Sequence, residues 1–174
     1  LVGRVLHAPR EATPRAERGG LLVAVSASTF VPKAHTPFQW DGQVPIDEVR
    51  RRQALIRGSM PNRGVELSWH DPSSSLLEAV LARGGRELAD GIEAAWRAGA
   101  RFDAWSEQFS LERWLEAFAE TGVDVTAAAS DPYVQGDPLP WSHIDSGLAE
   151  GFLRLERSRA ESASTTPDCT FGEC

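Results

Sequence analysis

Two short runs with different hydrophobic patterns predict a pair of β-strands in the first half of the chain. The run from Leu21 to Phe30 (LLVAVSASTF) is almost continuously apolar or β-branched, which is typical of a strand buried on both faces of a parallel sheet. Apolar and polar residues alternate from Val65 to Trp69, and this period of two predicts a second strand. Apolar residues at helical spacing after Pro45 predict a helix between the strands. The order strand, helix, strand indicates a parallel α/β unit.

The second half of the chain has the apolar spacing of helices. Its four predicted apolar stripes are Leu76, Leu77, Val80 and Leu81; Leu88, Ile92, Ala95 and Trp96; Leu111, Trp114, Leu115 and Phe118; and Leu148, Phe152 and Leu155. Asp71 and Ser110 are predicted N-caps of the first and third of these helices, and Asp145 or Ser146 is the predicted start of the last. Proline and glycine punctuate the stretch from Gly122 to Pro140, which is therefore predicted to be a loop.

These elements predict an α/β fold: the terminal strands and helices of a partial (β/α) barrel, followed by a mainly helical extension. Two strands cannot close a barrel, and a parallel sheet needs cover on both faces, so further strands are expected upstream of Leu1. The chain begins with Leu rather than Met, which also suggests a truncated or processed start. The expected organisation is a connector at 1–20, the end of the barrel at 21–83, the extension at 84–161 and a flexible, cysteine-containing tail at 162–174.

Charge is unevenly distributed along the 174 residues. Residues 1–87 carry a net charge of +3 and residues 88–174 a net charge of −10. An acidic half repels phosphate, so broad electrostatic binding to nucleic acid is not supported there, although Arg50, Arg51 and Arg52 leave RNA as an alternative partner. No apolar run approaches the length of a membrane span, and a cytoplasmic location is the default expectation.

The densest group of chemically capable residues follows the first predicted strand, in FVPKAHTPFQW (Phe30–Trp40). Loops at the carboxyl ends of strands build the active sites of α/β barrels. Two prolines fix the backbone around Lys33, His35 and Thr36, which suit an anionic or polar ligand, and Phe38 and Trp40 could stack on a flat ring. The alternative is a proline-stiffened loop whose aromatic side chains plug the barrel rim.

Two histidines in other clusters are further candidates. His70 and Asp71 follow the second strand, but as metal ligands they lack a third partner nearby, and Asp71 suits a helix cap better. His143 and Asp145 lie two residues apart in LPWSHIDSG and could act as a general base and its orienting carboxylate. A lone histidine beside a capping aspartate is the commoner arrangement.

Two more clusters have structural interpretations. Glu78 and Arg83 could form an ion pair, and Phe102 and Trp105 are expected to pack against the helices that they connect. The two cysteines, Cys169 and Cys174, both lie in the last six residues, which argues against a disulfide framework.

Several segments, in order, resemble a family of B12-binding-domain radical SAM proteins. The segments are FVPKAHTPFQW, HDPSSSLLEAVLARGGREL, ARFDAWSEQF, LPWSHIDSG and TTPDCTFGEC, and together they span roughly residues 21–174. The family usually has Pro at the position of Ala34 in the first segment. It has Asp and Arg at the positions of Gly85 and Glu87, which weakens the match of the second segment.

The resemblance implies a radical SAM core ending near residue 83, with the family's cluster-binding cysteine triad and B12-binding domain upstream. It implies a [4Fe–4S] cluster and S-adenosylmethionine in the complete protein, with cobalamin as an additional cofactor, and none of them tightly bound by this chain alone. The implied cofactor-binding residues are Phe30, Lys33, His35, Thr36, Phe38, Gln39, Trp40 and His70. Lys33, His35, His143 and Asp145 are the catalytic candidates.

The resemblance also bears on the tail and on partners. In the family the tail continues into further cysteines, so Cys169 and Cys174 would be part of an incomplete metal site. The expected partner is the N-terminal part of the same protein, and the substrate is unknown. Two alternatives remain open: a non-catalytic module that binds RNA or protein, and a stand-alone metal-binding regulatory domain.

Overall fold

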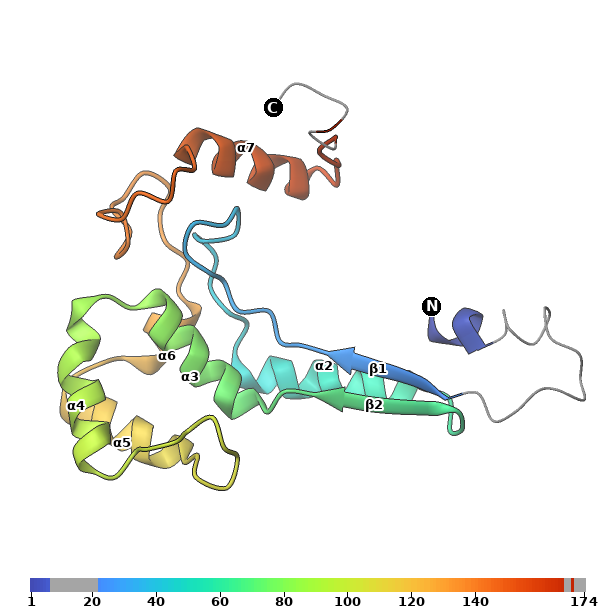
Figure 1. Cartoon of the computed structure of the whole chain (residues 1–174), viewed down its shortest axis with the longest axis horizontal. Helices are drawn as coiled ribbons and strands as arrows, with labels where there is room; N and C mark the ends of the chain where they lie inside the picture. The colour runs from blue at the N-terminus through green and yellow to red at the C-terminus, as the bar shows by residue number, and fades with distance from the viewer. Residues whose placement is uncertain (7–21, 168–169, 171–174) are drawn as a thin grey trace, which may run out of the picture. The chain divides into compact units, whose positions relative to one another are not determined.

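The fold is mixed α/β, with a two-stranded parallel sheet and a larger number of helices (Figure 1). This computed structural model describes residues 1–6, 22–167 and 170. The chain divides into two compact units. The first contains Leu1–Phe30 and Val44–Ser75, and the second contains Val31–Gln43 and Leu76–Cys174.

The first unit is built on a parallel strand–helix–strand arrangement, as the sequence pattern predicts. Strand β1 (Val23–Ala27) pairs in parallel with strand β2 (Val65–Trp69), with Val23 opposite Val65 and Ala27 opposite Trp69. Helix α2 (Ile46–Ser59) follows Pro45 and lies beside the two strands (Figure 1). The Arg57 guanidinium of α2 sits 4.7 Å from the centre of the Trp69 ring, so α2 covers the face of the sheet on which Trp69 lies.

The first strand is shorter and less buried than its sequence predicts. The expected strand from Leu21 to Phe30 is reduced to Val23–Ala27, and Leu21 lies outside the described residues. Side chains of β1 alternate between half-buried and exposed, and Leu22 and Phe30 are more than half exposed. The expectation of burial on both faces is therefore wrong for this chain. The reason is that α2 covers one face of the two-stranded sheet. Both faces of a strand are buried only when the sheet has a layer of structure on each side.

The second unit is helical. Its helices are α3 (Pro72–Arg83, whose first turn belongs to the first unit), the short 3₁₀ helix η2 (Arg86–Leu88), α4 (Ala89–Arg97), α5 (Leu111–Glu120), α6 (Val125–Ser130) and α7 (Glu150–Glu161). The predicted caps of α3 and α5 are confirmed. The Asp71 carboxylate accepts the backbone N–H of Ser73 at 2.7 Å, and the Ser110 hydroxyl accepts that of Arg113 at 3.3 Å.

Two buried apolar clusters hold this unit together. The larger one joins α3, α4, α5 and α6; Val80 is fully buried, Phe118 is 1% exposed, and the Trp114 and Phe118 rings lie 5.7 Å apart. Gly91 lets α4 approach α5 closely, because a Cβ there would lie 2.5 Å from the Phe118 ring. The smaller cluster contains Trp40, Leu139, Trp141 and Leu153, with Ala34 and Tyr133 packed against it.

The region between Gly122 and Pro140 is not the uninterrupted loop that its prolines and glycines suggest. Helix α6 forms within it because the Asp124 side chain accepts the N–H of Ala127 at 3.0 Å and three alanines follow. The last helix begins at Glu150 and not at Asp145 or Ser146. Asp145 instead accepts the N–H of Gly147, which has a positive φ of 76° that does not fit a helix.

Several predicted side-chain placements are also wrong, including those of Leu81, Leu115 and Leu148, which are 40%, 39% and 50% exposed. On α7 the buried residue is Leu153, while Phe152 and Leu155 are about half exposed. On α4 Leu88 precedes the helix and is buried, as is Ala95, but Ile92 and Trp96 are about half exposed. Phe102 and Trp105 are 75% and 62% exposed instead of packed. Glu78 does not pair with Arg83 but forms its ion pair with Lys33. Each error concerns a partner distant in sequence, which helical spacing does not identify.

Among the described residues, no helix combines the length and the apolar character needed to cross a membrane.

Candidate functional site

The candidate site is built around the loop that follows β1 in the chain, Val31–Gln43, which belongs to the helical unit. Its first residues, Val31 and Pro32, are buried. The Thr36 hydroxyl donates to the carbonyl of Lys33 at 2.8 Å, and the N–H of Gln39 donates to the carbonyl of Thr36 at 3.0 Å. These local bonds fold the segment into consecutive turns, as expected for a loop with two prolines.

The loop is tied to a distant segment of the chain by its backbone. The N–H of Tyr133 donates to the Trp40 carbonyl at 2.8 Å, and the N–H of Gln43 donates to the Ala129 carbonyl at 2.9 Å. Trp40 is 3% exposed and lies in the smaller apolar cluster, where the Arg154 guanidinium is 5.6 Å from its ring centre. The second half of the loop is therefore anchored in the core.

Gln39 fixes the first half of the loop. Its Oε1 accepts the backbone N–H of His35 at 3.0 Å and the indole N–H of Trp141 at 2.8 Å. The residue is only 4% exposed, and the bond to Trp141 spans 102 positions of sequence. His35 adopts a left-handed backbone with φ of 56°, a conformation in which histidine is enriched among non-glycine residues. The two bonds to Gln39 stabilise that conformation.

A buried arginine supports the segment that carries these anchors. Arg83 is 1% exposed and donates to the carbonyls of Ala128 and Asp131, at the C-terminal end of α6. Its guanidinium lies 4.8 Å from the centre of the Tyr133 ring, and the Tyr133 hydroxyl donates back to the Arg83 carbonyl at 2.6 Å. Burial lowers the pKa of Arg83 and raises that of Tyr133, because it disfavours the charged form of each.

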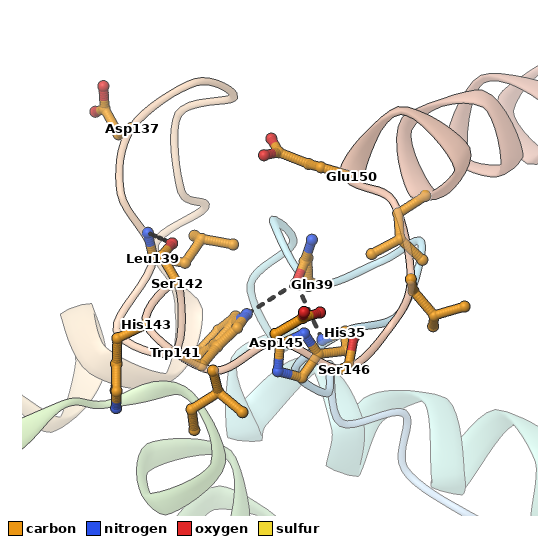
Figure 2. A pocket seen from close by; sticks show the side chains of 13 residues that line it. His35, Gln39, Asp137, Leu139, Trp141, Ser142, His143, Asp145, Ser146 and Glu150 are labelled. Carbon is orange, nitrogen blue, oxygen red and sulfur yellow. Dashed lines mark hydrogen bonds between the residues drawn. The ribbon is translucent and has the colours of Figure 1, made fainter.

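A cavity of about 350 Å³ opens beside this loop (Figure 2). Its floor is buried and largely apolar, formed by Leu139, Trp141 and Leu153 beside Gln39. The rest of its lining is more polar and consists of His35, Asp137, Ser142, His143, Ile144, Asp145, Ser146, Leu148 and Glu150. A cavity of this size lies at the lower end of the range for small-molecule sites.

The structure brings four of the candidates from the sequence to this cavity. His35 and Gln39 come from the loop, and His143 and Asp145 come from the segment before α7. His143 and Asp145 do not form a base–orienter pair, since the imidazole of His143 points away from the Asp145 carboxylate in Figure 2. Asp145 accepts the Gly147 N–H at 2.8 Å instead.

The other candidates lie elsewhere. Lys33 is half exposed and forms its ion pair with Glu78. Phe38 is partly exposed under the Arg157 guanidinium, 5.4 Å from its ring centre. Phe30 and His70 belong to the strand-containing unit, where the His70 carbonyl accepts a long bond of 3.4 Å from the Gln53 amide.

Trp141, Glu150 and Asp137 were not identified from the sequence as parts of a site. Trp141 lies in a motif that the sequence does single out, but its partner Gln39 is too distant in the chain to be inferred. No group of three or more potential metal ligands occurs among the described residues. The predicted metal ligands, Cys169 and Cys174, lie outside the part of the chain that the structure describes.

Comparisons with known proteins identify no relative: no family model, curated protein or solved structure matches this chain.

Proposed function

We propose that this chain forms the end of the α/β barrel and the C-terminal extension of a B12-binding-domain radical SAM enzyme. The observation that carries the proposal is the parallel pairing of β1 with β2, which are connected through helix α2, together with the loop Val31–Gln43, which is separated from the end of β1 by three residues. Parallel strands joined by a helix are the repeating unit of such barrels, and the loops after their strands form the active site. The segments that resemble the family follow one another in order between residues 30 and 174.

The described residues do not fit a [4Fe–4S] cluster. Such a cluster needs cysteine thiolates, and the two cysteines of this sequence lie outside the described residues. Under the proposal, the cluster and the radical chemistry belong to another part of the protein. The role of this chain is to hold one wall of a cavity, with His35 at the wall and Gln39 and Trp141 holding His35 in place.

The complete protein containing this chain provides the test. His35→Ala should lower the yield of 5′-deoxyadenosine or of product by at least about tenfold if the side chain lines the reacting cavity, with an unchanged melting temperature. Lys33→Ala tests the second polar side chain of the loop. Arg97→Ala is the control, because Arg97 lies on the exposed face of α4 and pairs with Glu93. Full turnover in both loop variants, or no 5′-deoxyadenosine from the wild-type protein reconstituted with iron and sulfide, would refute the proposal.

A second candidate function is a protein-binding module. It is favoured by three aromatic side chains of the helical unit, Trp96, Phe102 and Trp105, which are 53%, 75% and 62% exposed. Phe102 is also held at a positive φ of 59°. Replacing Phe102 and Trp105 with Ser should then abolish partner binding without changing the deoxyadenosine yield. RNA binding has less support, because Arg51 and Arg52 both pair with Glu48, and Arg50 pairs with Asp47.

A further inference from the structure

The cavity beside the loop has an uneven charge distribution. Three of its lining residues carry carboxylates, Asp137, Asp145 and Glu150, and none of its described lining residues is a lysine or arginine. Glu150 is partly neutralised by Arg154, whose Nε donates to it at 3.0 Å. Asp145 has no cationic partner among the described residues, and one of its oxygens accepts the Gly147 N–H. Uncompensated carboxylates around a concave surface favour a cationic group in the cavity.

The side-chain amide of Gln39 presents a hydrogen-bond donor at the floor of the same cavity. Its Oε1 accepts hydrogen bonds from two N–H groups, of His35 and of Trp141, so the oxygen and nitrogen of the amide are assigned without ambiguity. The amide nitrogen therefore faces the other way. In Figure 2 it points away from the Trp141 indole, towards the side of the cavity on which Glu150 lies.

No described residue accepts a hydrogen bond from this nitrogen. Gln39 is 96% buried, since its exposed fraction is 4%. A donor held at the floor of a cavity by two bonds to its own oxygen is pre-organised to meet an acceptor on a ligand. The nitrogen is not fully enclosed, so water can accept from it in the free protein, and a ligand that enters the cavity has to replace that water with an acceptor of its own. A ligand without such an acceptor would leave the donor unpaired, which favours ligands that carry one.

We propose that this cavity binds a small organic ammonium ion that carries a neutral carbonyl oxygen beside the amine and a short apolar group, the chemistry of an α-amino amide. The carbonyl oxygen accepts from the Gln39 Nε2. The ammonium group faces the Asp145 carboxylate, and the apolar group packs on the floor of Leu139, Trp141 and Leu153. A free carboxylate in place of the amide would meet repulsion from Asp145 and Glu150.

The inference is independent of the radical chemistry proposed above. It rests on the geometry of Gln39 and the charge of the cavity, and its test needs neither a cluster nor S-adenosylmethionine. Failure of the binding test would leave the proposed enzyme function standing, and absence of 5′-deoxyadenosine would leave the binding site standing.

Three probes separate the contact of the ammonium group with the carboxylates from the contact of the carbonyl oxygen with Gln39. L-Leucinamide carries the ammonium, the carbonyl and an isobutyl group; 4-methylpentanamide lacks the amine, and 3-methylbutylamine lacks the carboxamide. Binding to the chain is followed by two-dimensional NMR through the indole N–H of Trp141, which contacts Gln39. At about pH 6.5 an α-amino group is more than roughly nine-tenths protonated. We expect leucinamide to bind with a dissociation constant on the order of 1 mM, and each truncated probe to bind at least about tenfold more weakly.

Two nearly isosteric variants test the assigned atoms. Gln39→Glu keeps an oxygen for the His35 and Trp141 N–H groups, and these two bonds favour its ionised form, so the donor becomes an acceptor. It should weaken leucinamide by at least about tenfold while binding 3-methylbutylamine as well as the wild type or better. Asp145→Asn keeps the acceptor for Gly147 and removes the charge, so leucinamide should weaken by about three- to tenfold. Glu116→Gln, on α5, is the charge-matched control.

The outcomes are decisive in both directions. Saturable leucinamide binding that falls in both variants supports the site, and tighter binding of L-leucyl-alanyl-alaninamide would identify the N-terminus of a peptide as the source of this chemistry. Equal affinity for the tripeptide and leucinamide would identify a small amino-acid derivative. Absence of any shift of the Trp141 signal at tens of millimolar leucinamide, or equal binding of leucinamide by the Gln39→Glu variant and the wild type, would overturn the proposal.

Discussion

Replacement of Arg83 by methionine should destabilise the helical unit more than any other single change of a charged residue in it. The side chain is 1% exposed, and it donates to two main-chain carbonyls, of Ala128 and Asp131. Methionine keeps an unbranched chain of similar length but removes both donors. The two carbonyls at the C-terminal end of α6 would then be left without their charged partner, and the ring of Tyr133 would lose the cation above it.

The magnitude follows from two opposing terms. Hydrogen bonds from a charged donor are worth about 1.5–3 kcal/mol each, so two of them contribute about 3–6 kcal/mol. Against this stands the cost of burying the guanidinium, which is visible in its lowered pKa, and its Nε has no partner among the described residues. We expect a net loss of about 2–4 kcal/mol in the free energy of unfolding, because stranded carbonyls gain nothing from the removal of the charge.

Urea denaturation of the purified chain, followed by circular dichroism, measures this difference. Hydrogen exchange at residues 39–43 and 128–133 should show the same loss of protection, since the N–H of Gln43 donates to Ala129 and that of Tyr133 to Trp40. Arg83→Lys should be intermediate, because an ammonium cannot reach both carbonyls as the planar guanidinium does. Arg97→Met, on the exposed face of α4, should change stability by less than about 0.5 kcal/mol. A methionine variant at position 83 as stable as the wild type would show that desolvation outweighs the hydrogen bonds and would refute the reasoning.

Two further predictions concern close packing and acid stability. Gly42→Ala should lower the free energy of unfolding, measured in urea, by about 1–3 kcal/mol, because the new Cβ would lie 1.7 Å from the Ser130 carbonyl oxygen. The control is Gly151→Ala, which has open space around its Cβ and should be neutral or stabilising. Similar stabilities for the two variants would contradict the close approach of Gly42 to Ser130. Hydrogen bonds from Arg51 and then Arg52 lower the pKa of Glu48 from 4.5 to about 2, so the stability that this carboxylate contributes to α2 is present above pH 4.5 and lost as the pH falls towards 2. The helicity of α2, measured by NMR, should therefore fall less on acidification in the Glu48→Gln variant, and also in high salt. If helicity fell with pH in Glu48→Gln as it does in the wild type, the ion pairs of Glu48 with Arg51 and Arg52 would not contribute to the stability of α2.

Local signals in the sequence predict the parts of the fold that depend on neighbouring residues. The caps at Asp71 and Ser110 each act over two or three positions, and the apolar stripe of α5 repeats within one helix. The alternation from Val65 to Trp69 likewise describes one strand against its own surroundings. Such features form wherever the local chemistry is right, so the sequence alone predicts them.

The parts that the sequence does not predict depend on contacts between distant segments. Gln39 and Trp141 are 102 residues apart, and Arg83 and Ala128 are 45 apart. Leu153 rather than Phe152 faces inward on α7, because the pocket offered by Trp40, Leu139 and Trp141 receives one side of that helix. Helical periodicity specifies that one stripe is buried, but the neighbour decides which stripe.

The interpretation of the loop after β1 as a plug fits its second half, and ligand binding by its first half stays a prediction. Gln39 and Trp40 are almost completely buried, and they anchor the loop through the Trp141 indole and the Tyr133 N–H. Lys33 and His35 keep their side chains at the surface, because the bond that fixes His35 uses its backbone N–H and not its imidazole. The buried half of the loop keeps the first half rigid. His35 can therefore hold its left-handed backbone conformation at the cavity wall while its imidazole makes no hydrogen bond with the described residues. Ligand binding by the first half therefore predicts an effect of replacing the His35 imidazole or the Gln39 amide on binding, whereas a loop that is only a plug predicts an effect on stability alone.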